Sequence, residues 1–153
     1  MYFMAKTKKR KSGRIALVVS KFNKEVTDGL LKGALDVLSK NGFEEKELTI
    51  IYCPGAFEIP LTAKALCKSG KYCGVICLGA VIKGETAHFE YISNAVSTGL
   101  MELNVQYGMP VTFGVLTSYT EEQALARAAA DENNKGAEAA LAAIEMIETL
   151  KKI

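Results

Sequence analysis

The only histidine of the chain stands in a segment whose residue types suit proton transfer and anion binding. Residues 83–88 read Lys-Gly-Glu-Thr-Ala-His, after an apolar run and before a helical pattern. An imidazole is the side chain best suited to moving protons near neutral pH. A helix N-terminus with free N–H groups beside Lys83 is also an anion site. The simpler alternatives are a surface His88 and a Thr86 that acts only as the helix N-cap.

Two aromatic residues and a carboxylate suggest a place for a flat, hydroxylated ligand. Phe22 follows Lys21 where the chain leaves an apolar run. It is placed either to stack on a flat ring or to pack on the next helix turn. Glu58 lies between apolar residues and needs a partner there. It is either a first-turn helix acid or an acceptor for ligand hydroxyls, and Phe57 fits a core position as well as a ligand contact.

Two cations later in the chain stand out against their neighbours. Arg127 is the only cation in an alanine-rich helical segment, and Lys135 precedes Gly136 in an asparagine-rich turn. From local residues alone, a solvated surface charge is the simpler explanation for each. Phe113 lies in an apolar run and is expected in the core.

Apolar runs and helical spacing alternate along the chain and predict how these residues are placed. Strands are predicted at 14–20, 48–53, 72–82 and 111–117. Helices are predicted from Asn23, as N-cap, to 41–42, and at 59–67, 86–107, 121–130 and 136–151. The order indicates an α/β three-layer sandwich in which helices flank a four-stranded parallel sheet. Its strand-to-helix turns lie at one edge, which is where such sheets bind ligands.

Composition indicates one ordinary globular domain at residues 14–153, preceded by a basic arm at residues 1–13. The 153 residues are 49% hydrophobic and 24% charged, and the net charge of +2 is too small to indicate nucleic-acid binding. The arm is expected to be solvated, with nucleic-acid contact as the minor alternative. No apolar stretch approaches the ~20 residues of a membrane helix, and the first residues lack a signal-peptide core. We therefore expect no membrane partner and a cytoplasmic location.

The cysteine pattern argues against a zinc site, and the absence of nucleotide motifs argues against a P-loop or a dinucleotide site. The four cysteines form no C-x-x-C pair, and one histidine is too few for zinc, so structural thiols and no metal are expected. Neither a Walker A sequence nor G-x-G-x-x-G occurs.

Four blocks of sequence together resemble the lumazine synthase family of the riboflavin pathway. They are Ser-Lys-Phe-Asn at 20–23, Pro-Gly-Ala-Phe-Glu-Ile-Pro at 54–60, Gly-Ala-Val-Ile-Lys-Gly-Glu-Thr-Ala-His-Phe-Glu-Tyr at 79–91 and Asn-Lys-Gly at 134–136. The resemblance covers about residues 14–150. It implies that 5-amino-6-(ribitylamino)uracil condenses with 3,4-dihydroxy-2-butanone 4-phosphate to give 6,7-dimethyl-8-ribityllumazine, a reaction for which no metal or organic cofactor is expected. It also implies a flavodoxin-like sandwich, a homopentamer that in some members builds a sixty-subunit shell, and a functional link to riboflavin synthase.

The resemblance also implies roles for the matching residues. His88 would be the proton donor and acceptor. Glu85, Thr86 and Arg127 would bind the phosphate. The ribitylaminouracil would be bound by Phe22, Asn23, Ala56, Phe57, Glu58, Ala80, Val81, Ile82, Lys83, Lys135 and, from an adjacent subunit, Phe113.

The sequence departs from the family pattern in three places. Lys83 replaces the commoner arginine and loses a planar two-pronged contact. Ala126 stands where an acid often precedes the phosphate-binding arginine, and Asp131 with Glu132 occupies a turn that often carries lysine and glycine. Two alternatives to the enzyme remain at this point: a flavodoxin-like flavin carrier, and a shell-forming homologue without catalysis.

Overall fold

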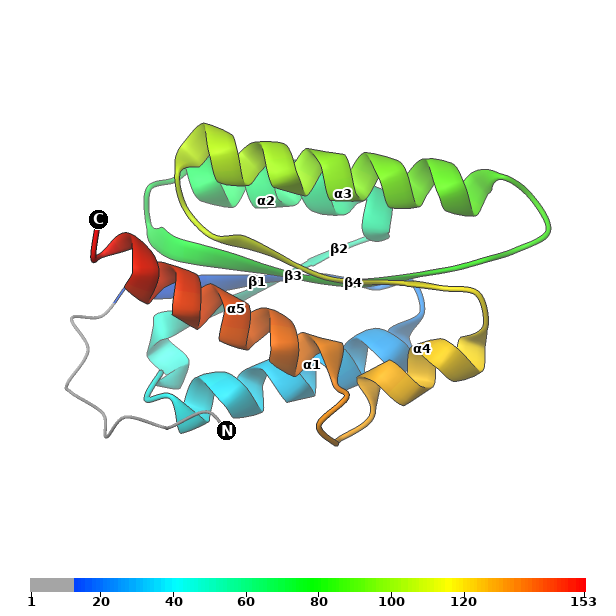
Figure 1. Ribbon diagram of the computed structural model, residues 1–153, viewed down its shortest axis with the longest axis horizontal. Coiled ribbons are helices and arrows are strands. Elements are labelled where there is room, and N and C mark those ends of the chain that lie inside the picture. Colours follow the sequence, from blue (N-terminus) through cyan, green and yellow to red (C-terminus); the bar gives the residue numbers. More distant parts are fainter. Residues whose placement is uncertain (1–12) are drawn as a thin grey trace.

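The computed structural model describes residues 13–153 as three layers (Figure 1). The predicted basic arm lies outside the described residues, apart from Gly13. A sheet in the middle is covered by two helices on one face and three on the other (Figure 1). The predicted α/β sandwich is therefore confirmed.

The sheet has the order β2-β1-β3-β4, and every neighbouring pair of strands is parallel. The strands are β1 (Arg14–Ser20), β2 (Leu48–Cys53), β3 (Tyr72–Ile82) and β4 (Val111–Ser118). The two central strands are almost entirely buried, which is why their sequences are nearly continuous apolar runs. The chain leaves β1 toward one side of the sheet for β2 and later crosses to the other side for β3.

Five helices flank the sheet: α1 (Lys24–Lys40), α2 (Ile59–Lys68), α3 (His88–Tyr107), α4 (Glu121–Ala128) and α5 (Lys135–Leu150). Two 3₁₀ turns, at Glu45–Glu47 and Ala56–Glu58, precede β2 and α2. The predicted helix ends differ from the observed ones by at most two residues. Helix α4 ends early because Ala129 is extended, and α5 begins at Lys135 because Asn134 caps it.

Each face of the sheet has its own hydrophobic cluster. Alternate residues of β1 point to opposite faces: Ile15 and Leu17 pack with α1 and α5, whereas Ala16 and Val18 pack with α2 and α3. Burying one large aliphatic side chain of this kind contributes about 1.5–3 kcal/mol. The two clusters therefore fix the helices on the sheet and, with them, the turns at its ends.

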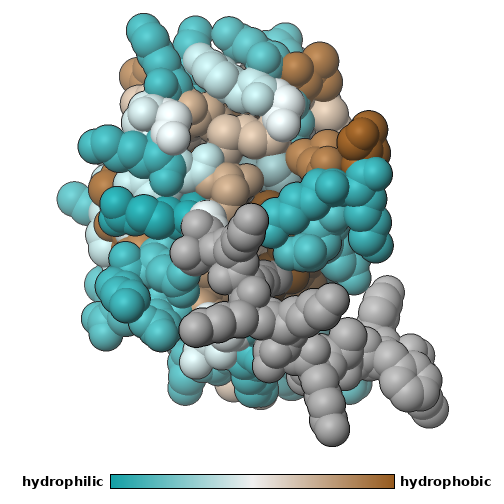
Figure 2. Space-filling model, turned by 90° about the vertical axis from the view of Figure 1, so that its left-hand side faces the viewer, coloured by the Kyte–Doolittle hydropathy of each residue, from teal (hydrophilic) through white to brown (hydrophobic). Residues whose placement is uncertain are grey.

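All four strand-to-helix turns lie at the same end of the molecule, on the right in Figure 1. The visible surface at the opposite end is largely hydrophilic, with smaller hydrophobic areas (Figure 2). Among the described residues, no helix is long and apolar enough to cross a membrane.

Asn23 occupies the predicted N-cap position of α1, whereas Thr86 does not cap α3, and neither side chain makes a capping bond. Asn23 does precede α1, but its side chain makes no capping bond; its backbone is left-handed, with φ of 62°, and its Nδ2 donates to Ala80 O over 3.2 Å. Thr86 does not begin α3, which starts after Ala87. Its Oγ1 instead accepts from the backbone N–H of His88 at 3.4 Å, within the turn.

The left-handed backbone of Asn23 predicts a difference between two substitutions. Asn23→Ala should lower the free energy of unfolding, because alanine pays about 1–2 kcal/mol in this conformation and the hydrogen bond to Ala80 is lost. Asn23→Gly loses only the hydrogen bond and should be the more stable variant. Chemical denaturation measures both, and equal losses would contradict this account of Asn23.

Burial predicts the reactivity of the thiols. Cys53, Cys67 and Cys77 are free and buried, and loss of solvation raises the pKa of each thiol. At about pH 8, a thiol reagent should therefore label half-buried Cys73 first and the other three only as the chain opens. Fast labelling of three or four thiols in the native protein would contradict this.

The same shifts give the direction of the pH dependence of stability. Above the ordinary cysteine pKa of 9.0, the unfolded chain loses its thiol protons before the folded chain does. The free energy of unfolding should therefore fall as the pH rises beyond about 9.

Candidate active site

The first candidate site is a hollow of about 700 Å³ at the carboxyl ends of β1 and β3. It lies where the strand order reverses, since β2 and β3 flank β1 on opposite sides. Its size is within the range of small-molecule sites. The lining residues are Phe22, Asn23, Gly55, Ala56, Phe57, Glu58, Ala80, Val81, Ile82, Gly84, Thr86, His88, Phe89, Tyr91 and Ile92.

Backbone hydrogen bonds fix the position of Phe22 at one side of this hollow. The N–H of Lys21 donates to Cys53 O at 2.9 Å, and that of Phe22 donates to Pro54 O at 3.1 Å. Asn23 adds its bond to Ala80 O. The backbone is thus tied to the turn after β2 and to β3, while the Phe22 ring is 71% exposed. This exposure favours the stacking interpretation over packing on the next helix turn.

The turn after β2 presents an aromatic ring and a carboxylate to the same hollow. Phe57 is 63% exposed, so the alternative that placed it in the core is wrong. Glu58 is also exposed, which removes the desolvation cost that its apolar neighbours in sequence suggested. The 3₁₀ turn at Ala56–Glu58 brings both residues to the lining.

His88 is the first residue of α3 and is exposed at the hollow. Thr86 and Gly84 line the hollow beside it, so the N-terminus of this 20-residue helix opens toward the same space. Lys83 and Glu85 belong to the same turn but are not among the lining residues. The Lys83 ammonium instead lies 5.6 Å from the centre of the Tyr119 ring, a cation–π distance.

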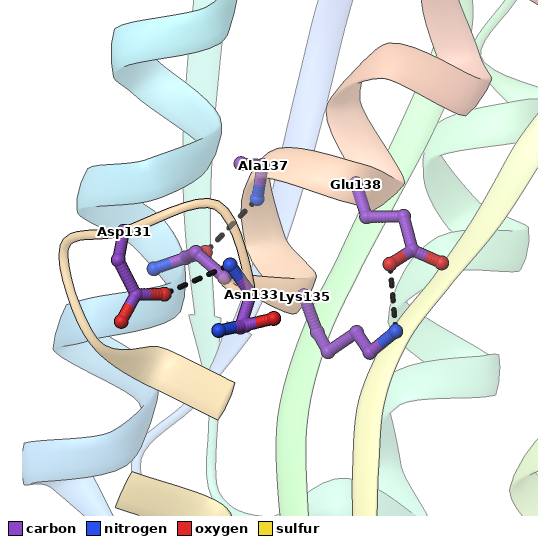
Figure 3. Close-up of polar contacts among 6 residues, drawn as sticks. Asp131, Asn133, Lys135, Ala137 and Glu138 are labelled. Carbon is purple, nitrogen blue, oxygen red and sulfur yellow. Dashed lines mark hydrogen bonds and ion pairs between the residues drawn. The ribbon is translucent and has the colours of Figure 1, made fainter. Parts of the chain in front are cut away.

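A second hollow, of about 390 Å³, runs along β4, which is an edge strand of the sheet. Residues 113–119 line it, together with Gln123, Arg127 and Lys135. Phe113 is 46% exposed here, so the expectation of a core position was wrong. Arg127 donates from its guanidinium to Gln123 O at 3.2 Å, and Lys135 pairs with Glu138 at 2.7 Å (Figure 3).

The two hollows share no lining residue. Phe89 of the first and Tyr119 of the second pack against each other, with ring centres 5.9 Å apart. A single chain thus brings Phe22, Glu58 and His88 together but does not bring Arg127 to them. Lys135 and Phe113 lie with Arg127 in the second hollow.

Sequence reasoning missed several lining residues. Tyr91 and Ile92 line the first hollow and follow His88 by three and four positions. That spacing places residues on one face of a helix, so it was a signal that could have found them. Gln123 of the second hollow is four positions before Arg127 and gave the same signal. Among the described residues, no group of three or more His, Cys, Asp or Glu side chains is placed to hold a metal ion.

Comparison with known proteins identifies the family. A sequence model of the family described as 6,7-dimethyl-8-ribityllumazine synthase matches residues 12–151. A protein of Caulobacter vibrioides named 6,7-dimethyl-8-ribityllumazine synthase 1 is 58% identical over 140 residues, which cover 92% of each chain. Both hollows lie within the matched residues. The chain therefore belongs to the 6,7-dimethyl-8-ribityllumazine synthase family.

Proposed function

We propose that the two hollows are the two halves of one active site, which is completed where two copies of the chain meet. As a family member, the chain condenses 5-amino-6-(ribitylamino)uracil with 3,4-dihydroxy-2-butanone 4-phosphate. The products are 6,7-dimethyl-8-ribityllumazine, inorganic phosphate and water, and this is the penultimate step of riboflavin biosynthesis. The chemistry therefore needs a flat apolar place for a ring, a proton shuttle and cations for a phosphate.

The distribution of charge between the hollows is the observation that carries this proposal. The residues that line the first hollow include His88 and Glu58 but no lysine or arginine. The second hollow contains Arg127 and Lys135. The second hollow thus suits the phosphate ester, and the first suits the pyrimidinedione ring with its ribityl chain. Both substrates must be at the same place for the condensation. An interface between copies supplies that arrangement.

In the proposed complex, the first hollow binds the ribitylaminouracil. Phe22 stacks on the pyrimidinedione ring, and Glu58 accepts hydrogen bonds from ribityl hydroxyls. Ala80, Val81 and Ile82 line the ring and the chain at the end of β3, while Ala56 and Phe57 close the other side. Asn23 keeps an unused side-chain oxygen beside this position, because its observed bond uses the amide nitrogen.

The second hollow of a neighbouring copy supplies the phosphate site. Arg127 is the principal cation, and its planar guanidinium suits phosphate oxygens. Thr86 and Glu85 lie in the turn before α3, whose N-terminal end attracts negative charge. Phe113 and Lys135 complete the ribitylaminouracil site from the same neighbour.

The reaction then follows from orientation and one proton shuttle. The 5-amino group attacks the ketone carbonyl, water leaves and an imine forms. His88 removes the proton next to the imine, the electron pair expels inorganic phosphate, and ring closure releases a second water. Holding two reactants side by side can supply several kcal/mol of barrier lowering. None of these steps transfers electrons to or from an external acceptor.

A flavin carrier and a catalytically silent shell former would each need fewer of these site residues. A flavin carrier would need no His88, and the family match argues against it. A silent shell former would not need Phe22, Glu58, Thr86, His88 or Arg127, all of which are present.

Assembly and location belong to the same proposal. We propose a homopentamer that can pack further into a shell of sixty subunits, located in the cytoplasm and supplying riboflavin synthase. Residues 129–134 form a short connection between α4 and α5, which permits a shell, and the buried free thiols of Cys53, Cys67 and Cys77 suit a reducing compartment. Sedimentation or light scattering distinguishes a pentamer from a shell.

The direct test is to mix the two substrates with the purified protein. Fluorescent lumazine and one equivalent of inorganic phosphate should appear together. A yellow, redox-active preparation that forms no lumazine would favour the flavin carrier, and a colourless, inactive assembly would favour the silent homologue.

His88→Ala should lower kcat by about 10²–10⁴-fold without abolishing turnover, because orientation of the substrates remains when the proton shuttle is lost. Steady-state kinetics of the folded variant give this ratio. A folded His88→Ala protein with no activity, or with unchanged kcat, would contradict the division between orientation and proton transfer.

Arg127→Ala should mainly raise the KM for the ketone phosphate, since the lost cation binds the phosphate before and during the reaction. Arg127→Lys is the matched control: it keeps the charge, loses the planar fork, and should fall between wild type and Arg127→Ala. An unchanged KM in Arg127→Ala would remove Arg127 from the site.

A further inference from the structure

Asn134, between α4 and α5, is the most highly connected buried polar side chain outside both hollows. It is 3% exposed, and its Nδ2 lies within 3.0 Å of Gly29 O, 3.1 Å of Ala128 O and 2.9 Å of Ala129 O. Its Oδ1 accepts from the N–H of Ala137 at 3.0 Å. One side chain therefore joins α1, the end of α4 and the start of α5.

The atoms that Asn134 holds are next to the two cations of the second hollow. Ala128 and Ala129 directly follow Arg127, and Lys135 directly follows Asn134. Their carbonyls belong to the point where α4 ends, since Ala129 is already extended. The amide thus fixes the backbone on the C-terminal side of Arg127 and on the N-terminal side of Lys135.

Asn134 packs closely against α1. A Cβ atom added at Gly33 would overlap Asn134 Oδ1, and one added at Gly136 would overlap the carbonyl of Leu30. The side chain therefore contacts α1 where α1 has no side chains of its own. Helix α1 also begins directly after Phe22 and Asn23, so it connects this contact to the first hollow.

The other hydrogen bonds of the turn between α4 and α5 join residues of the turn itself. Asp131 Oδ1 accepts from the N–H of Asn133 at 2.8 Å, as Figure 3 shows, and Asp131 O accepts from the N–H of Asn134 at 3.2 Å. Lys135 and its partner Glu138 lie beyond this turn, at the start of α5 (Figure 3). Besides the direct packing of Gly29 on Ala128 and of Leu30 on Gly136, the hydrogen bond from this turn to α1 is thus made by Asn134 and not by Asp131.

We propose that Asn134 is a positioning residue for anion binding by Arg127. The inference rests on the proposed function in that Arg127 binds the phosphate end of the substrate, while Lys135 belongs to the ribitylaminouracil site. Displacement of a binding group by about 1 Å can cost about 10²-fold in rate. Loss of the Asn134 bonds releases the backbone beside both cations and weakens phosphate binding while leaving His88 untouched.

Asn104 is a matched control, because it makes the same kind of connection away from both hollows. It lies on α3, its Nδ2 donates to Leu100 O at 2.9 Å and Val111 O at 2.8 Å, and its Oδ1 accepts from the N–H of Val111 at 2.8 Å. It thus ties α3 to the start of β4, at the opposite end of the sheet from the turns. A purely structural role predicts equal behaviour of the two positions.

The experiment compares Asn134→Ser with Asn104→Ser. Serine at 134 keeps a good N-cap for α5 but cannot reach the three carbonyls. Both variants should unfold at lower denaturant concentration. Only Asn134→Ser should raise the KM for the ketone phosphate, by about tenfold, and weaken binding of inorganic phosphate measured by calorimetry, with kcat changed by less than about threefold.

A double-variant cycle tests whether Asn134 acts through Arg127. In the Arg127→Ala background, Asn134→Ser should cause a much smaller further rise in KM than it does alone, because the main cation is already gone. An unchanged KM in Asn134→Ser, an equal rise in Asn104→Ser, or full additivity with Arg127→Ala would each overturn the proposal.

A second variant and a binding measurement keep the proposal testable if Asn134→Ser does not fold or if the wild type is inactive. If Asn134→Ser does not fold, Asn134→Asp, which keeps the shape and the cap but lacks the amide donors, is compared in the same way. If the wild-type protein forms no lumazine, the proposed function fails, whereas the inorganic phosphate titration still reads the effect of Asn134 on Arg127.

Discussion

Hydrogen bonding between strands that all run in one direction constrains where chemistry can occur in this fold. It places every strand-to-helix turn at one end of the sheet, so Phe22, Glu58 and His88 meet although they are far apart in sequence. The hollow opens between β1 and β3, because the connection from β1 to β2 and the later connection from β2 to β3 run in opposite directions along the sheet. The side chains of Phe22, Glu58 and His88 are exposed, and it is their backbones that the sheet and its turns hold.

Helix α1 connects the backbone of the first hollow to that of the second. It starts beside Phe22 and packs against both α4 and α5, and its glycine-lined face accepts Asn134. The cations are therefore fixed relative to the same sheet that fixes the imidazole. Yet they lie along the edge strand β4 and not in the first hollow. In the proposed shared site, this rigid connection within one chain would let a second chain complete the site in a defined geometry.

The sequence predicted the sheet well, because β1 and β3 are buried on both faces and their apolar runs end at clear breaks. It failed for the capping bonds expected of Asn23 and Thr86, since the side-chain partner of Asn23 is the carbonyl of Ala80, 57 residues away. It could not assign Phe57 and Phe113, because an apolar residue has the same pattern in a core and on an exposed surface. The separation of Arg127 from His88 could not be predicted from the sequence, because all strand-to-helix turns lie at one end of the sheet. Only the structure shows that the two residues line different hollows.

The central claim, that each active site takes one half from each of two chains, is tested most directly by mixing variants. His88→Ala damages the first half and Arg127→Ala the second, so random co-assembly should leave about a quarter of the interfaces with both halves intact. Activity should rise above the sum of the separate variants. A mixture of His88→Ala with Phe22→Ala, which damages the first half of every chain, should show no such gain. If the first mixture gives no more activity than its components, the shared site is contradicted.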